Sequence, residues 1–91
     1  MSKEVYLITT SGCVGCSIMI YHFRILEQLD SCEYFLHVVD FKNVPEFISL
    51  NVPYTDFPTL VCVENNIIKY HESGTMTMKH LKEVLKDINF I

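Results

Sequence analysis

Hydrophobic residues recur along this chain with two different spacings, which together predict four strands and three helices. Stretches rich in aromatic and β-branched residues predict strands at 4–9, 33–40, 59–63 and 67–72. Helical spacing and helix-start signals predict helices from 13 or 14 to about 30, from Pro45 to about Leu50, and from Thr77 onward. The predicted order is therefore β-α-β-α-β-β-α.

The two longer helices each have candidate buried positions. In the first helix we expect these to include Ile18, Ile25, Leu26 and Leu29. In the last helix, Thr77 is the expected N-cap, and one face carries Met78, Leu81, Val84, Leu85 and Ile88.

The order of elements indicates how the strands pair. A strand–helix–strand opening requires a right-handed crossover between two parallel strands. The turn at Asn65 and Asn66 tolerates positive φ, so the last two strands form an antiparallel hairpin. The sequence thus predicts an α/β fold, in which one domain over 1–91 holds a four-stranded mixed sheet with helices on both faces.

Charge and hydropathy exclude several functions. The 91 residues carry a net charge of −4, and no stretch clusters Lys and Arg, so nucleic acid and anionic membrane surfaces are not expected partners. The longest apolar stretches fall well short of the ~20 residues of a membrane helix. Residues 1–4 lack the features of a signal peptide, so we expect a cytoplasmic protein, in which thiols stay reduced.

The most informative motif is Cys13-Val14-Gly15-Cys16, which lies where the first strand gives way to the first helix. A helix start presents free N–H groups and the positive end of the helix dipole, worth about 0.3–1 kcal/mol toward an anion. A thiolate is such an anion, so the more N-terminal Cys13 is the expected nucleophile. Cys16, one turn further on, is the expected resolving thiol. The pair indicates a redox dithiol.

With this dithiol and strand order, Phe57-Pro58-Thr59 before a strand and Gly74 before the last helix make the chain resemble the thioredoxin superfamily. The resemblance covers nearly the whole chain. It implies that Pro58 is cis and lies against the dithiol, that the backbone of Phe57 pairs with an extended substrate, and that Gly74 lines the same groove. The implied substrate-binding residues are Val14, Gly15, Phe57, Pro58, Thr59 and Gly74.

The chain departs from the pattern of thioredoxins in three ways. Gly12 stands where they place Trp before the first cysteine, and Val14-Gly15 replaces their Gly-Pro. Leu7 stands where they bury an acid, six residues before the first cysteine. Because Cys16 then lacks a base for its proton, we expect slower resolution than in a typical thioredoxin. The chain looks like a minimal thioredoxin-like protein of glutaredoxin size.

The expected function is that of a monomeric thiol–disulfide oxidoreductase that reduces protein disulfides without an organic cofactor or metal. A flavin-dependent thioredoxin reductase is the expected electron donor, and glutathione is the alternative. A non-catalytic thioredoxin-fold binding or redox-sensing module is a second interpretation. A third is a metal or iron–sulfur cluster held by Cys13 and Cys16 across a dimer.

The remaining chemistry-bearing residues have structural interpretations that we favour. Cys62 is expected to be a buried small hydrophobe, and Cys32 could form a regulatory or intermolecular disulfide; with the dithiol the two could complete a zinc site. Tyr54 and Phe57, with Val14 and the Gly74 loop, could form an apolar rim around Cys13. His22 lies about nine residues past Cys13 on the same predicted helix, too far away to activate the thiol directly. Strand or surface positions are expected for His37, His71 and His80, and solvated loop positions for Asp40 and Asp56.

Overall fold

The computed structural model of the protein describes residues 2–29 and 32–91. Its elements are β1 (Lys3–Thr9), α1 (Val14–Leu29), β2 (Phe35–Asp40), the 3₁₀ helix η1 (Phe41–Asn43), α2 (Glu46–Ser49), β3 (Thr59–Glu64), β4 (Ile67–Ser73) and α3 (Met78–Asp87). Every element expected from the sequence is present, whereas η1 was not expected. Residue 30, the predicted end of the first helix, lies outside the described residues.

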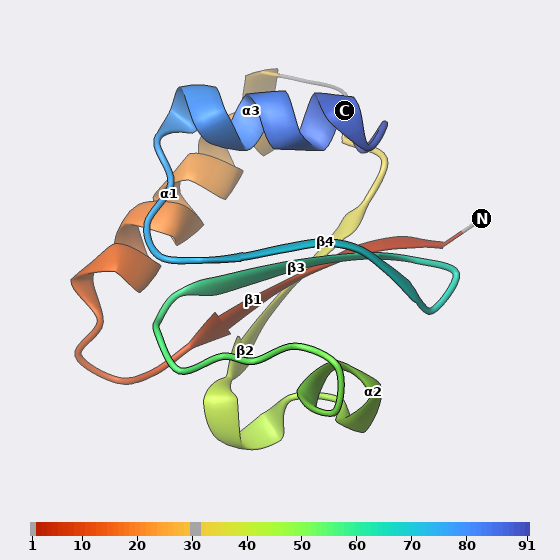
Figure 1. The fold of residues 1–91 in the computed structure, drawn as a ribbon. Coiled ribbons are helices and arrows are strands. Elements are labelled where there is room, and N and C mark those ends of the chain that lie inside the picture. The colour runs from red at the N-terminus through yellow and green to blue at the C-terminus, as the bar shows by residue number, and fades with distance from the viewer. Residues whose placement is uncertain (1, 30–31) are drawn as a thin grey trace.

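The four strands form one mixed sheet in the order β2-β1-β3-β4. β1 runs parallel to β2 and antiparallel to β3, and β3 is antiparallel to β4. Figure 1 shows α1 and α3 on one face of this sheet, with η1 and α2 on the other. The predicted α/β architecture with helices on both faces is therefore confirmed.

Each face of the sheet has its own hydrophobic core. Successive strand residues point to opposite faces, so Leu7 of β1 packs in the core under α1 and α3, whereas the next residue, Ile8, packs with Ile48 of α2. β3 is buried on both faces, because Cys62 joins the first core and Val61 the second. β3 and β1 are the two central strands of the sheet.

The buried face of α1 differs from the expected one. Leu26 is buried as expected, but Ile18 and Leu29 are 41% and 69% exposed, so their predicted burial is wrong, and Ile25 is only half-buried. The residues that α1 buries are Cys16, Met19, Phe23 and Leu26. The helix carries two apolar stripes, and hydrophobic spacing alone does not say which of them the crossover turns toward the sheet.

α3 follows the prediction closely. It buries Leu81, Val84 and Leu85, and Met78 and Ile88 pack partly buried against the same core. The Thr77 hydroxyl accepts a hydrogen bond from the backbone N–H of His80 at 3.1 Å, which confirms the N-cap. No helix in residues 2–29 and 32–91 combines the length and apolar character needed to span a bilayer.

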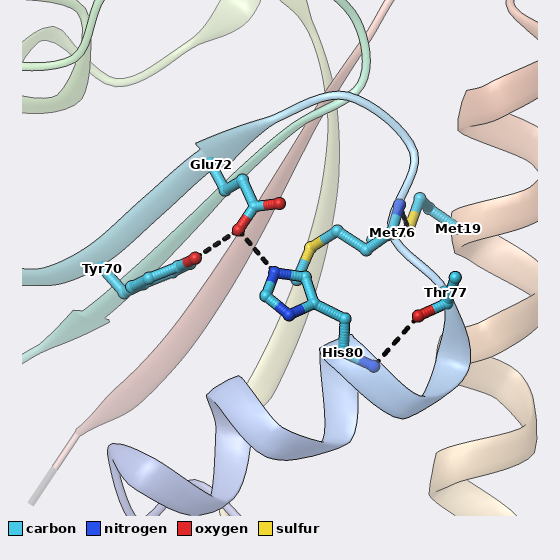
Figure 2. Close-up of polar contacts among 6 residues, drawn as sticks. All are labelled: Met19, Tyr70, Glu72, Met76, Thr77 and His80. Atoms are coloured by element: carbon cyan, nitrogen blue, oxygen red, sulfur yellow. Dashed lines mark hydrogen bonds and ion pairs between the residues drawn. The ribbon is translucent and has the colours of Figure 1, made fainter.

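The connection from β4 to α3 is fastened at several points, which Figure 2 shows. The Glu72 carboxylate of β4 pairs with the His80 imidazole of α3 at 2.8 Å and also accepts a hydrogen bond from the Tyr70 hydroxyl. Between these ends, the backbone N–H of Met76 contacts the Met19 sulfur of α1 at 3.4 Å. The connection is therefore held against α1, near the position where α1 begins.

Candidate dithiol site

Segments that are distant in sequence meet at one end of the sheet, where strands begin or finish. The strand registers place the end of β1 at Thr9 beside the end of β2 at Asp40, and the start of β3 at Thr59 beside the end of β4 at Ser73. Because Ile8 pairs with Thr59, these four strand termini all lie at the same end of the sheet. The loops leaving it carry the dithiol, Pro58 and Gly74.

The two site cysteines form a disulfide, with their Cα atoms 5.2 Å apart. Cys13 immediately precedes α1 and is half-buried, whereas Cys16, inside the first turn, is only 4% exposed. The backbone N–H of Cys16 donates a hydrogen bond to Cys13 Sγ at 3.0 Å. This N–H, together with the dipole of α1, would stabilise a Cys13 thiolate once the disulfide is reduced.

The loop before β3 lies against this turn. The Phe57–Pro58 peptide bond is cis, as the resemblance implies, and Pro58 is buried. The N–H of Gly74, whose φ of +101° suits a residue without a side chain, donates to the Pro58 carbonyl at 2.8 Å. Within residues 2–29 and 32–91, neither the N–H nor the C=O of Phe57 has a backbone partner.

Thr75 is a contact residue that the sequence did not reveal. A side chain at Gly15 would overlap the Thr75 hydroxyl oxygen, and its Cβ would lie 3.2 Å from Cδ of Pro58. The β4–α3 connection and the Pro58 loop therefore both pack against the backbone between the two cysteines. Only glycine fits at position 15 without movement of Thr75, which accounts for the glycine inside the dithiol motif.

We expect Gly15→Ala to lower the free energy of unfolding of the oxidised protein by about 1 kcal/mol, because overpacking of this kind typically costs about 1–3 kcal/mol. Helix propensity alone would give the opposite sign, since alanine in a helix is about 0.5–1 kcal/mol better than glycine. In a Thr75→Ala background the same change should be neutral or stabilising. Urea unfolding of the four proteins measures the coupling. Equal effects of Gly15→Ala in both backgrounds would contradict the contact.

A shallow pocket of about 400 Å³ opens on the other side of the dithiol. Its lining residues are Thr9, Thr10, Gly12, Cys13, Val14, Cys16, Ser17 and Ile20. Apart from the two cysteines, none of these residues has a titratable side chain. Leu7, at the position of the expected acid, is fully buried in the apolar core. The pocket therefore supplies hydroxyl groups but no carboxylate or imidazole that could take the proton of Cys16.

Val14, Phe57 and Thr59, which the resemblance also assigns to substrate binding, differ in how far they are exposed to solvent. Val14 is 75% exposed between the cysteines, and Phe57 is half-buried. Thr59 is fully buried, and its hydroxyl bonds with the Asp56 carbonyl at 2.7 Å and the Ser73 hydroxyl at 2.9 Å. Thr59 therefore supports the Pro58 loop from inside the protein instead of presenting its side chain to the groove.

The other two cysteines lie apart from the dithiol. Cys62 is fully buried on β3, as expected, and burial raises the pKa of its thiol to about 12. Cys32 is half-buried, and its thiol contacts the Leu26 carbonyl at 3.6 Å and the Tyr34 hydroxyl at 3.7 Å. In the described part of the chain, no three His, Cys, Asp or Glu residues are grouped so that they could hold a metal ion.

The histidines and the two named acids have local roles. His37 of β2 pairs with Glu4 at 3.0 Å, and His80 pairs with Glu72. Asp40 accepts a hydrogen bond from the backbone N–H of Lys42 at 2.9 Å and so caps η1. Neither these two histidines and Asp40 nor His22, His71 and Asp56 line the dithiol pocket.

Comparisons with known proteins identify the fold. No protein-family model matches the chain, and no curated protein sequence does. Solved structures match nearly all of it. It is similar to thioredoxin O2 from Arabidopsis thaliana in its oxidised state, with 20% identity and a TM-score of 0.71, over 96% of this chain and 75% of that one.

Two further thioredoxins give the same result. Mitochondrial thioredoxin 3 from Saccharomyces cerevisiae is 18% identical with a TM-score of 0.71, over 94% of this chain and 78% of that one. Thioredoxin-2, a component of the malaria parasite's protein secretion machinery, is 15% identical with a TM-score of 0.75, over 94% and 82%. At these identities the likeness establishes the fold: the chain is a thioredoxin-fold protein with a Cys13–Cys16 disulfide.

Proposed function

We propose that this protein is a thiol–disulfide oxidoreductase that reduces protein disulfides through Cys13 and Cys16. The observation that carries the proposal is the placement of the disulfide at the start of α1, against the loop that contains the cis Phe57–Pro58 peptide. Cys13, which is more accessible than Cys16, accepts a hydrogen bond from the Cys16 N–H, and Phe57, whose backbone groups have no backbone partner in the described residues, precedes the Pro58 that packs against the dithiol turn. A disulfide-bearing segment could therefore bind as an added strand while Cys13 attacks.

The reaction proceeds by two exchanges in which atoms and electrons balance. The Cys13 thiolate attacks one sulfur of the substrate disulfide, forms a mixed disulfide and releases the other substrate sulfur as a thiolate. Cys16 loses its proton and attacks Cys13, which closes the Cys13–Cys16 disulfide and releases the second substrate thiolate. The substrate gains two electrons and two protons, and the protein dithiol loses them.

The environment of the two thiols makes the second exchange the slower one. The start of α1 favours the Cys13 thiolate, but Cys16 is almost fully buried, and burial disfavours its charged form. Leu7, at the position of the expected acid, carries no carboxylate. We therefore propose that the proton of Cys16 passes to water or to the departing substrate thiolate, and that resolution limits turnover.

The protein needs an external donor to return to the dithiol form, and we propose a flavin-dependent thioredoxin reductase, with the protein acting as a monomer in the cytoplasm. With NADPH and such a reductase, steady oxidation of NADPH should follow addition of a protein disulfide substrate. Reduced glutathione with glutathione reductase should support less than a tenth of that rate. The reverse pattern would show that glutathione is the donor.

A second candidate is a non-catalytic thioredoxin-fold binding or redox-sensing module. It is favoured by Leu7, which leaves the resolving thiol without a base, and by Gly12, which places no side chain beside Cys13. Against it stand the intact dithiol, with its partly accessible Cys13, and the Phe57-Pro58-Thr59 segment with its cis bond, because a scaffold needs neither. The two candidates differ in turnover, which the second lacks.

A further inference from the structure

The residue before Cys13 contributes no apolar side chain to the surface at the dithiol. That residue is Gly12, which has no side chain and takes a φ of +70° in the turn. η1 follows β2 at the same end of the sheet as the dithiol and begins with Phe41. This aromatic residue lies 28 positions from Cys13 in sequence, so no local motif connects the two.

Contacts link Phe41 to the dithiol turn. The Phe41 and Phe57 rings have centroids 5.6 Å apart and an interplanar angle of 55°. Phe57 is joined to Pro58, whose Cδ packs against Gly15 between the cysteines. The Phe57 ring also packs against the second core. The Phe41 ring is therefore linked to the dithiol turn through Phe57 and the loop that contains Pro58.

Phe41 is also held in place while part of its ring stays accessible. The Asp40 carboxylate caps η1 by accepting the Lys42 N–H at 2.9 Å, and the Thr9 hydroxyl, at the end of β1, donates to the Val39 carbonyl at 3.1 Å. The side chain of Phe41 is 37% exposed and belongs to neither hydrophobic core. The Lys42 ammonium lies over the ring, 5.7 Å from its centroid, and the exposed part of the ring is not used for core packing.

The alternative is that Phe41 is one of several incidental exposed apolar residues. Phe35, at the start of β2, is an example: it is 75% exposed and pairs in register with Glu4, at the opposite end of the sheet from the dithiol. Phe41 differs from it in contacting the aromatic residue that precedes Pro58. Phe35, which begins β2, can therefore serve as the control position for Phe41, which follows the end of β2.

We propose that Phe41 is a specificity-determining residue that forms, together with Phe57, an apolar wall of the substrate groove. This wall receives a bulky apolar side chain beside the cysteine that Cys13 attacks. The inference rests on the proposed function, since it concerns which disulfides the dithiol reduces. Removing the Phe41 ring should remove roughly 40–60 Å² of apolar contact with the substrate side chain. At about 25 cal/mol per Å², this loss corresponds to a five- to tenfold lower kcat/KM.

The test compares Phe41→Ala and Phe35→Ala with the wild type in dithiothreitol-driven reduction of three substrates. Two are peptides of equal length whose cysteine forms a mixed disulfide with a chromophoric aromatic thiol, one with phenylalanine and one with serine beside that cysteine. The third is hydroxyethyl disulfide, which is too small to reach the wall. Phe41→Leu keeps an apolar side chain and controls for loss of folding.

Phe41→Ala should lower kcat/KM for the phenylalanine peptide five- to tenfold and leave the serine peptide and hydroxyethyl disulfide within about twofold. Phe35→Ala should leave all three unchanged, and Phe41→Leu should keep at least half of the wild-type preference. An equal loss on both peptides, or no loss on either, overturns the assignment of Phe41 while wild-type turnover stands. A wild type that reduces none of the three substrates overturns the proposed function, and this inference with it.

Discussion

Replacing Cys16 by serine should stop turnover and leave Cys13 covalently joined to its substrate. Cys13 would still be activated by the start of α1 and would still attack, but no second thiol would lie within reach to release the mixed disulfide. The expected result is a stoichiometric, dithiothreitol-sensitive adduct between the protein and a disulfide-bonded substrate. Non-reducing electrophoresis and mass spectrometry of the digested adduct identify the joined cysteine.

The control for this experiment is a Cys32→Ser background, because Cys32 is half-buried and could form adducts of its own. Cys62 needs no such control, since it is fully buried and its pKa is raised to about 12, which keeps it a thiol. Cys13→Ser should form no adduct. A stable adduct on Cys16 in Cys13→Ser would reverse the roles that we assign to the two cysteines.

Replacing Leu7 by aspartate should cost more stability than any other single change considered for this protein. Leu7 has no exposed surface and packs in the core under α1 and α3. Shortening a buried leucine costs about 2–5 kcal/mol, and the carboxyl group gains no partner there. We expect a loss of more than about 4 kcal/mol, a large share of the 5–15 kcal/mol typical of a domain. Urea unfolding measures it.

Leu7→Asn is the matched control, because it has the same shape without the charge. Burial raises the pKa of the introduced carboxyl above the ordinary value of about 3.9. Above that pH the folded state then binds more protons than the unfolded state, so the stability of Leu7→Asp falls as pH rises. The two variants should match below about pH 4 and diverge toward pH 7. Identical stabilities at all pH values would show that position 7 is hydrated.

The same pair of variants tests the missing base. In the folded fraction, the introduced carboxylate should speed the resolving step, measured as the decay of the mixed disulfide after a single turnover, whereas Leu7→Asn should not. Unchanged decay in Leu7→Asp would count against the view that resolution is slow because Cys16 lacks a proton acceptor.

Much of the fold could be predicted because several local signals agree with one another. The aromatic and β-branched stretches, the Asn65-Asn66 turn, where both φ angles are positive, and the Thr77 cap each specify one element. The dithiol was also identifiable, since a cysteine pair between a strand and a helix has few other uses. The sheet and its helix layers follow from that order.

The features that the sequence did not predict depend on contacts between distant segments. The buried stripe of α1 is one of two apolar stripes, and only packing on the sheet decides that Met19 and not Ile18 is buried. Thr75 reaches Gly15 because the β4–α3 connection is held against α1, and Phe41 reaches Phe57 through a 3₁₀ helix that no periodicity marks. Such contacts leave no local pattern in the sequence.

The central claim is that the dithiol is catalytic, and one measurement tests it most directly: reduction of a protein disulfide substrate driven by dithiothreitol, with wild type compared with Cys13→Ser. The account predicts that wild type accelerates the reaction well above dithiothreitol alone and that the acceleration vanishes in Cys13→Ser. Equal, negligible acceleration by both proteins would contradict it and would favour the non-catalytic module.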